Sequence, residues 1–181
     1  LLKLKIIFTN KQHYLKFLHI LQKIETSISQ YLGLKTFVSL ITGGVSYIIL
    51  LFIGIDSPEF WSFLIVILNF IPTVGSLIGT LFPAIFSLLQ FGDFFPFLVI
   101  LILVGAVQIL VGNILEPRLM GHSLNISSLA AIISLSFWGF IWGITGMILS
   151  IPISVIMIIL FSQFHKTKAI AILLSKNGEL T

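Results

Sequence analysis

The sequence predicts an all-α membrane protein, built from polytopic transmembrane helices with one or two broken or re-entrant helical hairpins. Of its 181 residues, 57% are hydrophobic and only 9% are charged, and the mean hydropathy is +1.16. Soluble domains carry about 25% charged residues. Between Glu59 and Lys166 the charged residues are Asp93, Glu116 and Arg118, so this stretch needs lipid rather than water around it. The sequence also lacks the alternating apolar and polar segments of a transmembrane β-barrel.

Residues 1–35 are predicted to form an amphipathic segment at the cytoplasmic interface. Apolar residues recur at every third or fourth position from Leu15 to Ile28, and charged residues fall between them. Two interpretations stay open: a basic helix on the anionic cytoplasmic leaflet, or a helix docked on another part of the same protein. The chain starts with Leu1 rather than Met, so we expect a piece of a longer protein.

Residues 36–162 are expected to form the transmembrane domain, which opens with a crossing from Thr36 to Ile55. This uncharged run matches the ~20 residues that a helix needs to cross a ~30 Å hydrocarbon core. Lys35 flanks one end, and Asp56 and Glu59 flank the other. Because basic flanks stay in the cytoplasm, the segment should run from inside to outside.

The next uncharged run, from Phe60 to Gly92, is too long for a single crossing without extreme tilt. Pro72 lies near its middle, lacks a backbone donor and disfavours helix at the residue before it. Irregular backbone at membrane depth is tolerated where it is buried in protein or lines a wet cavity. We therefore predict a re-entrant hairpin of two short helices, with Asn69–Ser76 at its tip.

A further crossing is predicted from Pro96 to Leu115, ahead of Glu116. Residues 127–161 could hold two short crossings or a second hairpin that turns near residues 138–143. Residues 163–181 are then a basic cytoplasmic tail. With this layout every basic loop lies in the cytoplasm, as the positive-inside rule requires.

The two predicted hairpins share a loose pattern. Gly75 precedes Pro83 in the first, and Gly143 and Gly146 precede Pro152 in the second. Entry from opposite faces of the membrane is the arrangement of inverted repeats in secondary transporters. Glycine and proline are also frequent in transmembrane helices generally, so both explanations stay open.

Several classes of chemistry have no support in the sequence. There is no cysteine, so disulfides and thiolate metal sites are excluded. The acids and histidines are scattered, without metal-ligand spacing, a phosphate-binding glycine loop or a Ser/His/Asp set. We therefore expect no enzymatic activity, no catalytic residue, no metal, no cofactor and no nucleic-acid partner.

Three segments carry a resemblance to a known family: Asn69–Gly75 followed by Pro83, then Gln108–Gly121, then Leu135–Pro152. In this order and spacing they resemble the autoinducer-2 exporter family of bacterial permeases, also called PerM-type permeases. The resemblance implies a multi-helix inner-membrane protein that exports autoinducer-2, a quorum-sensing signal, or exchanges sodium or lithium for protons. The resemblance implies that the chain corresponds to a C-terminal portion of such a protein, without the family's N-terminal membrane helices and the domain after them. We expect either a truncated gene product or a piece of a longer chain.

The residues singled out fall into three groups: a substrate pathway, a gating or ion-coupling pair, and structural motif positions. They are Asn69, Pro72, Gly75, Ser76, Gln108 and Asn113 for the pathway, Glu116 and Arg118 for gating, and Pro83, Pro117, Gly121, Gly143, Gly146 and Pro152 for the motifs.

The amide of Asn69 could hold a polyhydroxylated solute or a partly dehydrated cation, or it could satisfy backbone groups that Pro72 frees. Glu116 and Arg118 could gate the path or accept a proton. Alternatively they are an interfacial pair, with Pro117 ending the helix.

Gln108 and Asn113 are five residues apart, so in an α-helix they do not share a face. Interhelical hydrogen bonding is the alternative role for these two amides. Gly143 and Gly146 could form a turn or allow close helix packing.

The first hypothesis is a permease that exports a small polar solute such as autoinducer-2 by alternating access. The alternatives are a sodium (lithium)/proton antiporter, a truncated non-transporting membrane subunit, and a pore. Expected partners are the lipid bilayer, a small polar solute or a monovalent cation, and further copies of the chain in a homo-oligomer. The expected location is the bacterial inner membrane, with both terminal segments in the cytoplasm.

Overall fold

The computed structural model describes residues 11–120, 126–164, 166–176 and 178, and these residues form helices joined by short turns. The helices are α2 (Lys11–Ile53), α3 (Pro58–Leu68), α4 (Val74–Phe91), α5 (Phe94–Leu110), the π-helical segment η1 (Val111–Leu115), α6 (Glu116–Met120), α7 (Ser128–Ser162) and α8 (Lys168–Leu174). Four of the helical spans in these ranges are long and apolar enough to cross a membrane. The predicted class, an all-α protein of several membrane helices, is confirmed.

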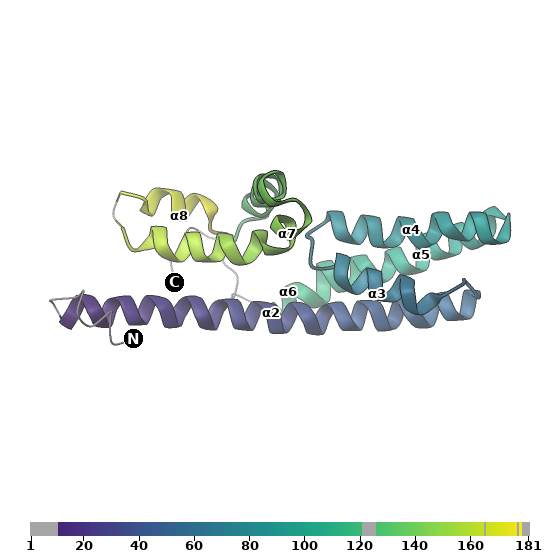
Figure 1. The fold of residues 1–181 in the computed structure, drawn as a ribbon, viewed down its shortest axis with the longest axis horizontal. Helices are drawn as coiled ribbons and strands as arrows, with labels where there is room; N and C mark the ends of the chain where they lie inside the picture. Colours follow the sequence, from purple (N-terminus) through teal and green to yellow (C-terminus); the bar gives the residue numbers. More distant parts are fainter. Residues whose placement is uncertain (1–10, 121–125, 165, 177, 179–181) are drawn as a thin grey trace.

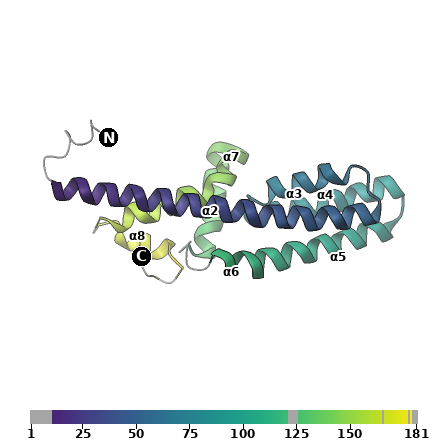
Figure 2. The same cartoon turned by 90° about the horizontal axis from the view of Figure 1, so that it is seen from below.

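Helix α2 runs the length of the molecule, and the other helices pack along it in two groups (Figures 1 and 2). Its C-terminal half packs with α3, α4 and α5 around a core that includes Leu50, Ile65 and Ile100. Its N-terminal half packs with α7, and a second core joins Tyr31 and Met120 to Ile151, Val155 and Ile159. The space between these two cores is where the candidate site lies.

Helix α2 also changes one expectation from the sequence. It continues without a break from Lys11 to Ile53, through the boundary expected at residue 35 between the amphipathic segment and the first crossing. Charged side chains occur up to Lys35 and are absent from residues 36–55, but the helical backbone passes through this boundary. The division into domains at this residue stays a prediction.

Close packing joins α2 to the first hairpin. Gly43 lies so near α3 that a Cβ there would overlap Val66 and would come within 3.1 Å of the Ser62 carbonyl oxygen. At the far end, Gln90 of α4 accepts a hydrogen bond from the Asp56 backbone N–H (2.8 Å) and donates one to the Gly54 carbonyl (2.9 Å). These contacts fix α3 and α4 against the C-terminal half of α2.

The two helices of the first predicted hairpin and the break between them are confirmed, and the tip is shorter than expected. Its re-entry from one side of the membrane stays a prediction. Helix α3 ends at Leu68 and α4 begins at Val74, so the irregular backbone covers residues 69–73. Gly75 lies directly against the Leu68 carbonyl oxygen, where a Cβ would overlap that oxygen. Thr73 has a φ of 58°, a strained value for a β-branched residue.

Helix α7 is also a hairpin, with its turn at Gly143, as the sequence predicted near residues 138–143. Gly143 has φ 61° and ψ −141°, a conformation that belongs to glycine. The two halves of α7 contact each other on either side of this turn: Ser154 Oγ of the second half donates a hydrogen bond to Ser134 Oγ of the first at 2.6 Å. Gly146 lies against the Trp138 carbonyl oxygen, as Gly75 lies against that of Leu68. An inverted repeat relating the two hairpins stays a prediction.

The helix predicted to end before Pro117 does not end there. Asp93 caps the start of α5 by accepting a hydrogen bond from the Phe95 N–H at 3.1 Å, and helical backbone continues through η1 and α6 to Met120. The π-turn precedes Pro117, whose ring would clash with the carbonyl four residues earlier in a regular α-helix. The interpretation of Pro117 as a helix stop is therefore wrong.

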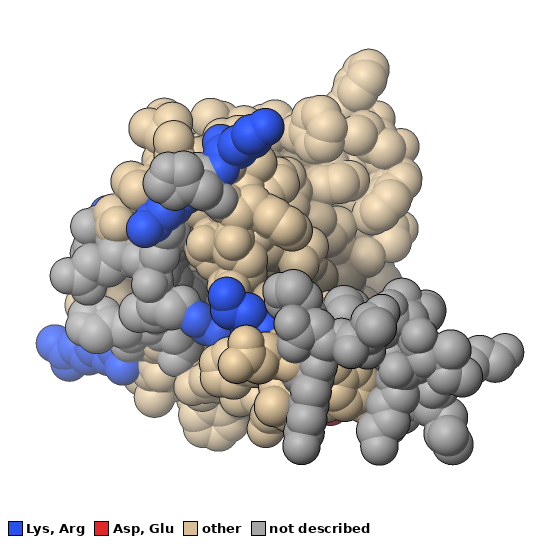
Figure 3. Space-filling model, turned by 90° about the vertical axis from the view of Figure 1, so that its left-hand side faces the viewer, with Lys and Arg blue, Asp and Glu red and all other residues tan. Residues whose placement is uncertain are grey.

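One end of the molecule carries lysine side chains from several elements. Lys16 of α2 and Lys166, Lys168 and Lys176 of the tail are exposed, and Figure 3 shows blue side chains over this end, where α8 and the N-terminal half of α2 lie. The tail also contains a short helix, α8, which buries Ala171 and packs on α7.

Candidate functional site

A cavity of about 330 Å³ lies where the tip of the first hairpin meets α2, α5–η1–α6 and α7. Its polar lining comes from three separate parts of the chain: α2, the hairpin tip with the start of α4, and α5–η1–α6. These residues are Tyr31, Lys35, Asn69, Thr73, Ser76, Gln108, Asn113 and Glu116. The remaining lining is mostly apolar and includes Ile71, Pro72 and Ile151. Small-molecule sites in proteins have volumes of roughly 300–1,000 Å³, with a few polar groups in an apolar wall.

The hairpin tip supplies one wall of this cavity. Asn69 is buried and donates a hydrogen bond through Nδ2 to Ser39 Oγ at 3.1 Å. This contact joins the tip to α2. The Asn69 amide therefore bonds to a side chain here, and not to a backbone group that Pro72 frees. Pro72, Thr73 and Ser76 complete the wall. Gly75 does not line the cavity, but it is buried and lies against the Leu68 carbonyl oxygen at the base of the tip.

Gln108 supplies an unused hydrogen-bond donor. Its side chain lines the cavity and is 7% exposed, and its Nε2 has no partner among the described residues. A buried donor without a partner is costly, and such groups in native proteins call for an explanation. The interhelical hydrogen bond that the sequence offered as an alternative role is not made by this nitrogen. A bound solute that brings an acceptor oxygen would satisfy it.

The π-helical turn η1 brings Asn113 to the same cavity as Gln108. From the α-helical angle of 100° per residue, the two side chains were expected on different faces, and that expectation is wrong. In η1 the Glu116 backbone N–H bonds to the Val111 carbonyl, five residues back, so residues five apart come to one side. Single π-turns of this kind are frequent at functional sites.

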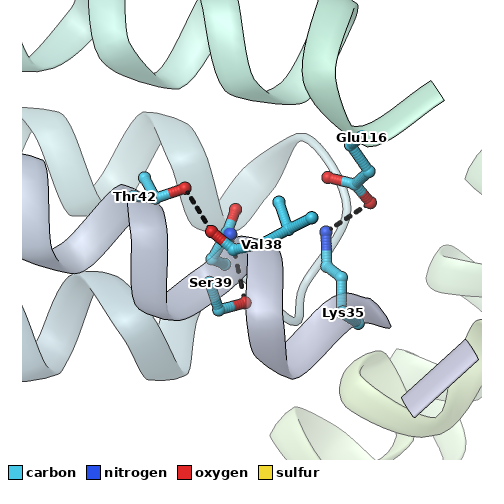
Figure 4. A network of polar contacts seen from close by, with 6 residues as sticks. Lys35, Val38, Ser39, Thr42 and Glu116 are labelled. Carbon is cyan, nitrogen blue, oxygen red and sulfur yellow. Dashed lines mark hydrogen bonds and ion pairs between the residues drawn. The ribbon is translucent and has the colours of Figure 1, made fainter. Parts of the chain in front are cut away.

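Glu116 and Lys35 form an ion pair at the wall of the cavity (Figure 4). Lys35 Nζ lies 2.6 Å from Glu116 Oε1, and the side chains are 5% and 20% exposed. The pair joins α2 to α6 across 81 positions of sequence. The sequence instead grouped Glu116 with Arg118. Arg118 is exposed and is not among the residues that line the cavity.

A second cavity of about 270 Å³ adjoins the first between α4 and α5. The two share Thr73, Ser76, Gln108 and Ile109 in their walls. Thr80 continues the line of hydroxyl groups one turn beyond Ser76. The polar surface at the hairpin tip therefore extends along α4 toward the other end of the bundle.

Of the remaining singled-out residues, those that the structure describes do not line these cavities. Pro83 is buried inside α4, and Pro152 is buried inside the second half of α7. Gly143 and Gly146 shape the α7 hairpin, and Gly121 lies outside the described residues. Among the described residues, no group of three or more His, Asp or Glu side chains could hold a metal ion.

Sequence reasoning missed Lys35, Tyr31 and Thr73 as parts of the wall. A usable signal existed for Lys35. The positive-inside layout put Lys35 and the Glu116–Arg118 segment at the same membrane face. Opposite charges at the ends of two neighbouring crossings can pair there.

Comparison with known proteins gives the family. The model of the family described as "AI-2E family transporter" matches residues 2–166. The chain belongs to the AI-2E transporter family. The predicted resemblance is thus confirmed, and the family together with the apolar helices indicates a multi-pass membrane protein.

Curated relatives in this family have transport names. The chain is 39% identical to "AI-2 transport protein TqsA" of Escherichia coli over 155 residues, which cover 86% of the chain and 45% of that protein. It is 37% identical to a "Putative transport protein" of Borreliella burgdorferi, covering 88% and 44%, and 34% identical to "Putative transport protein YhhT" of E. coli, covering 84% and 42%. The chain spans less than half the length of these relatives.

Proposed function

We propose that this AI-2E family protein moves a small, uncharged, polar solute, such as autoinducer-2, through the cavity at the tip of the α3–α4 hairpin. The observation that carries the proposal is the unpartnered Nε2 of Gln108 in the wall of a cavity of about 330 Å³. Hydroxyl groups of Thr73 and Ser76 and the amide of Asn113 lie in the same wall. Together they offer donors and acceptors that suit a solute with several oxygens.

The direction proposed is export across the inner membrane by alternating access. Lysines gather at the end formed by α8 and the start of α2 (Figure 3), and basic segments favour the cytoplasmic side. The two hairpin tips supply broken helices of the kind found at the binding sites of secondary transporters. The name of TqsA, "AI-2 transport protein", supports the choice of solute.

The test is autoinducer-2 flux from proteoliposomes that contain the full-length protein with Gln108→Leu. Leucine keeps most of the volume of glutamine and removes the donor. We expect a loss of flux of about five-fold or more, since a hydrogen bond to an otherwise unpaired group is worth about 1–3 kcal/mol. Gln163→Leu, at an exposed position outside the cavity, is the matched control and should keep wild-type flux. Equal flux in both variants would remove Gln108 from the path.

A second candidate is exchange of sodium or lithium for protons, and the position of Glu116 in the cavity wall favours it. In that case Glu116→Gln should abolish cation exchange and its pH dependence. For autoinducer-2 transport, the same variant should not create a pH dependence of flux.

A further inference from the structure

The ion pair in the cavity wall has a consequence for what the cavity can bind. Lys35 Nζ contacts Glu116 Oε1 at 2.6 Å, and the lysine side chain is 5% exposed. A carboxylate so placed already has its counter-cation, supplied by the protein itself. An incoming metal cation would have to displace a fixed ammonium that is held in α2, or share the carboxylate with it.

The other polar groups of the wall carry no charge. They are the phenol of Tyr31, the amides of Asn69, Gln108 and Asn113, and the hydroxyls of Thr73 and Ser76. Glu116 is the acid, and Lys35 the base, among the described residues that line the cavity. The charges of the lining therefore cancel. Without Lys35 the wall would carry one negative charge beside six neutral residues that each have a side-chain oxygen.

We propose that Lys35 determines the specificity of the cavity: its ammonium neutralises Glu116, so that uncharged polar solutes are admitted and monovalent cations are excluded. This inference rests on the proposed function and adds the residue that selects the class of solute. Hard cations bind where carboxylate and carbonyl oxygens are free to coordinate them. A buried ammonium at the same carboxylate adds like-charge repulsion against an incoming cation. The lysine thus turns a potential cation site into a neutral one.

The test is equilibrium binding of radioactive Na⁺ to the full-length protein in detergent. Lys35→Gln leaves Glu116 unpaired, and we expect it to bind Na⁺ at least about ten-fold more tightly than the wild type. The double variant Lys35→Gln/Glu116→Gln is the matched control, because it has the same lysine replacement and a neutral cavity. We expect it to bind Na⁺ no better than the wild type does.

A second variant covers the case in which the loss of Lys35 prevents folding. Asn113→Asp adds a carboxylate of nearly the same shape in the same cavity and leaves the ion pair of α2 with α6 intact. It should also bind Na⁺ at least about ten-fold more tightly than the wild type, since the cavity again carries one negative charge. Unchanged Na⁺ affinity in Lys35→Gln, or in Asn113→Asp where Lys35→Gln does not fold, overturns the inference.

Autoinducer-2 flux of the wild type, measured in parallel, separates this inference from the proposed function. Absence of that flux contradicts the proposed solute. The Na⁺ comparison still reports whether Lys35 sets the charge of the cavity, because it needs no transported solute.

Discussion

Both hairpin tips depend on a glycine that touches the backbone of the preceding helix, and this predicts a specific sensitivity to alanine. A Cβ at Gly75 would overlap the Leu68 carbonyl oxygen, and one at Gly146 would overlap that of Trp138. In each case the obstructing atom belongs to the backbone, so no side-chain rotation can relieve the overlap. Alanine at either position therefore has to push the two helices of its hairpin apart.

The cost follows from what must move. Overpacking that shifts backbone costs about 1–3 kcal/mol or more, and for a forced backbone contact we expect about 3 kcal/mol in each variant. Gly44→Ala is the matched control, because a Cβ at this helical position has no atom within 4 Å. Alanine there should be neutral or should stabilise the helix by up to about 1 kcal/mol.

The assay is thermal unfolding of the full-length variants in detergent, followed by intrinsic fluorescence. Gly75→Ala and Gly146→Ala should each lower the Tm by roughly 5 °C or more, while Gly44→Ala should leave it unchanged or raise it. Wild-type stability in both tip variants would refute the close approach of helix and carbonyl on which the description of the hairpins rests.

Three further predictions concern the surroundings of the cavity. Asn69→Leu removes the amide of the tip and its hydrogen bond to Ser39. Solute flux should fall at least about ten-fold, while the amount of protein inserted in the membrane stays the same. Undiminished flux would contradict this prediction. Pro117→Ala restores a backbone donor and removes the ring that opposes a regular helix. Flux should therefore drop without loss of Tm. A lower Tm with normal flux would argue against the role of η1 in bringing Asn113 to the cavity. Gly43→Leu should separate α2 from α3 and lower stability by about 1–3 kcal/mol, whereas a leucine at Gly44 should not, as parallel melting curves would show.

Hydropathy and the placement of proline and glycine were enough to predict the helical class, the break at Pro72 and a turn near residues 138–143. These features follow from local chemistry: an uncharged run too long for one crossing, and residues that cannot continue a helix. The end of the Pro96–Leu115 helix was not predictable in this way. A π-turn lets the chain pass Pro117 and continue to Met120, and its extra residue per turn has no signature in the hydrophobic pattern.

The residues of the site were only partly predictable for a similar reason. The amides and hydroxyls of the pathway stand out in the sequence because polar groups are rare in the apolar runs. The partner of Glu116 does not stand out. Lys35 lies 81 positions away, whereas Arg118, two positions away in sequence, is exposed and is not among the residues that line the cavity. Which charges pair is decided by how α2 lies against α6, and this is a property of tertiary packing.

The claim that the hairpin tip meets the solute can be tested by chemical protection. The 181 residues contain no cysteine, so Ser76→Cys would place a single thiol of this region in the wall of the cavity, and Ser136→Cys would place one on an exposed face of α7 as the control. The decisive measurement is the rate at which a small water-soluble thiol reagent labels each variant with and without saturating autoinducer-2. We expect the solute to slow labelling at residue 76 and to leave residue 136 unchanged; a rate at residue 76 that does not respond to the solute would contradict a binding site at the tip.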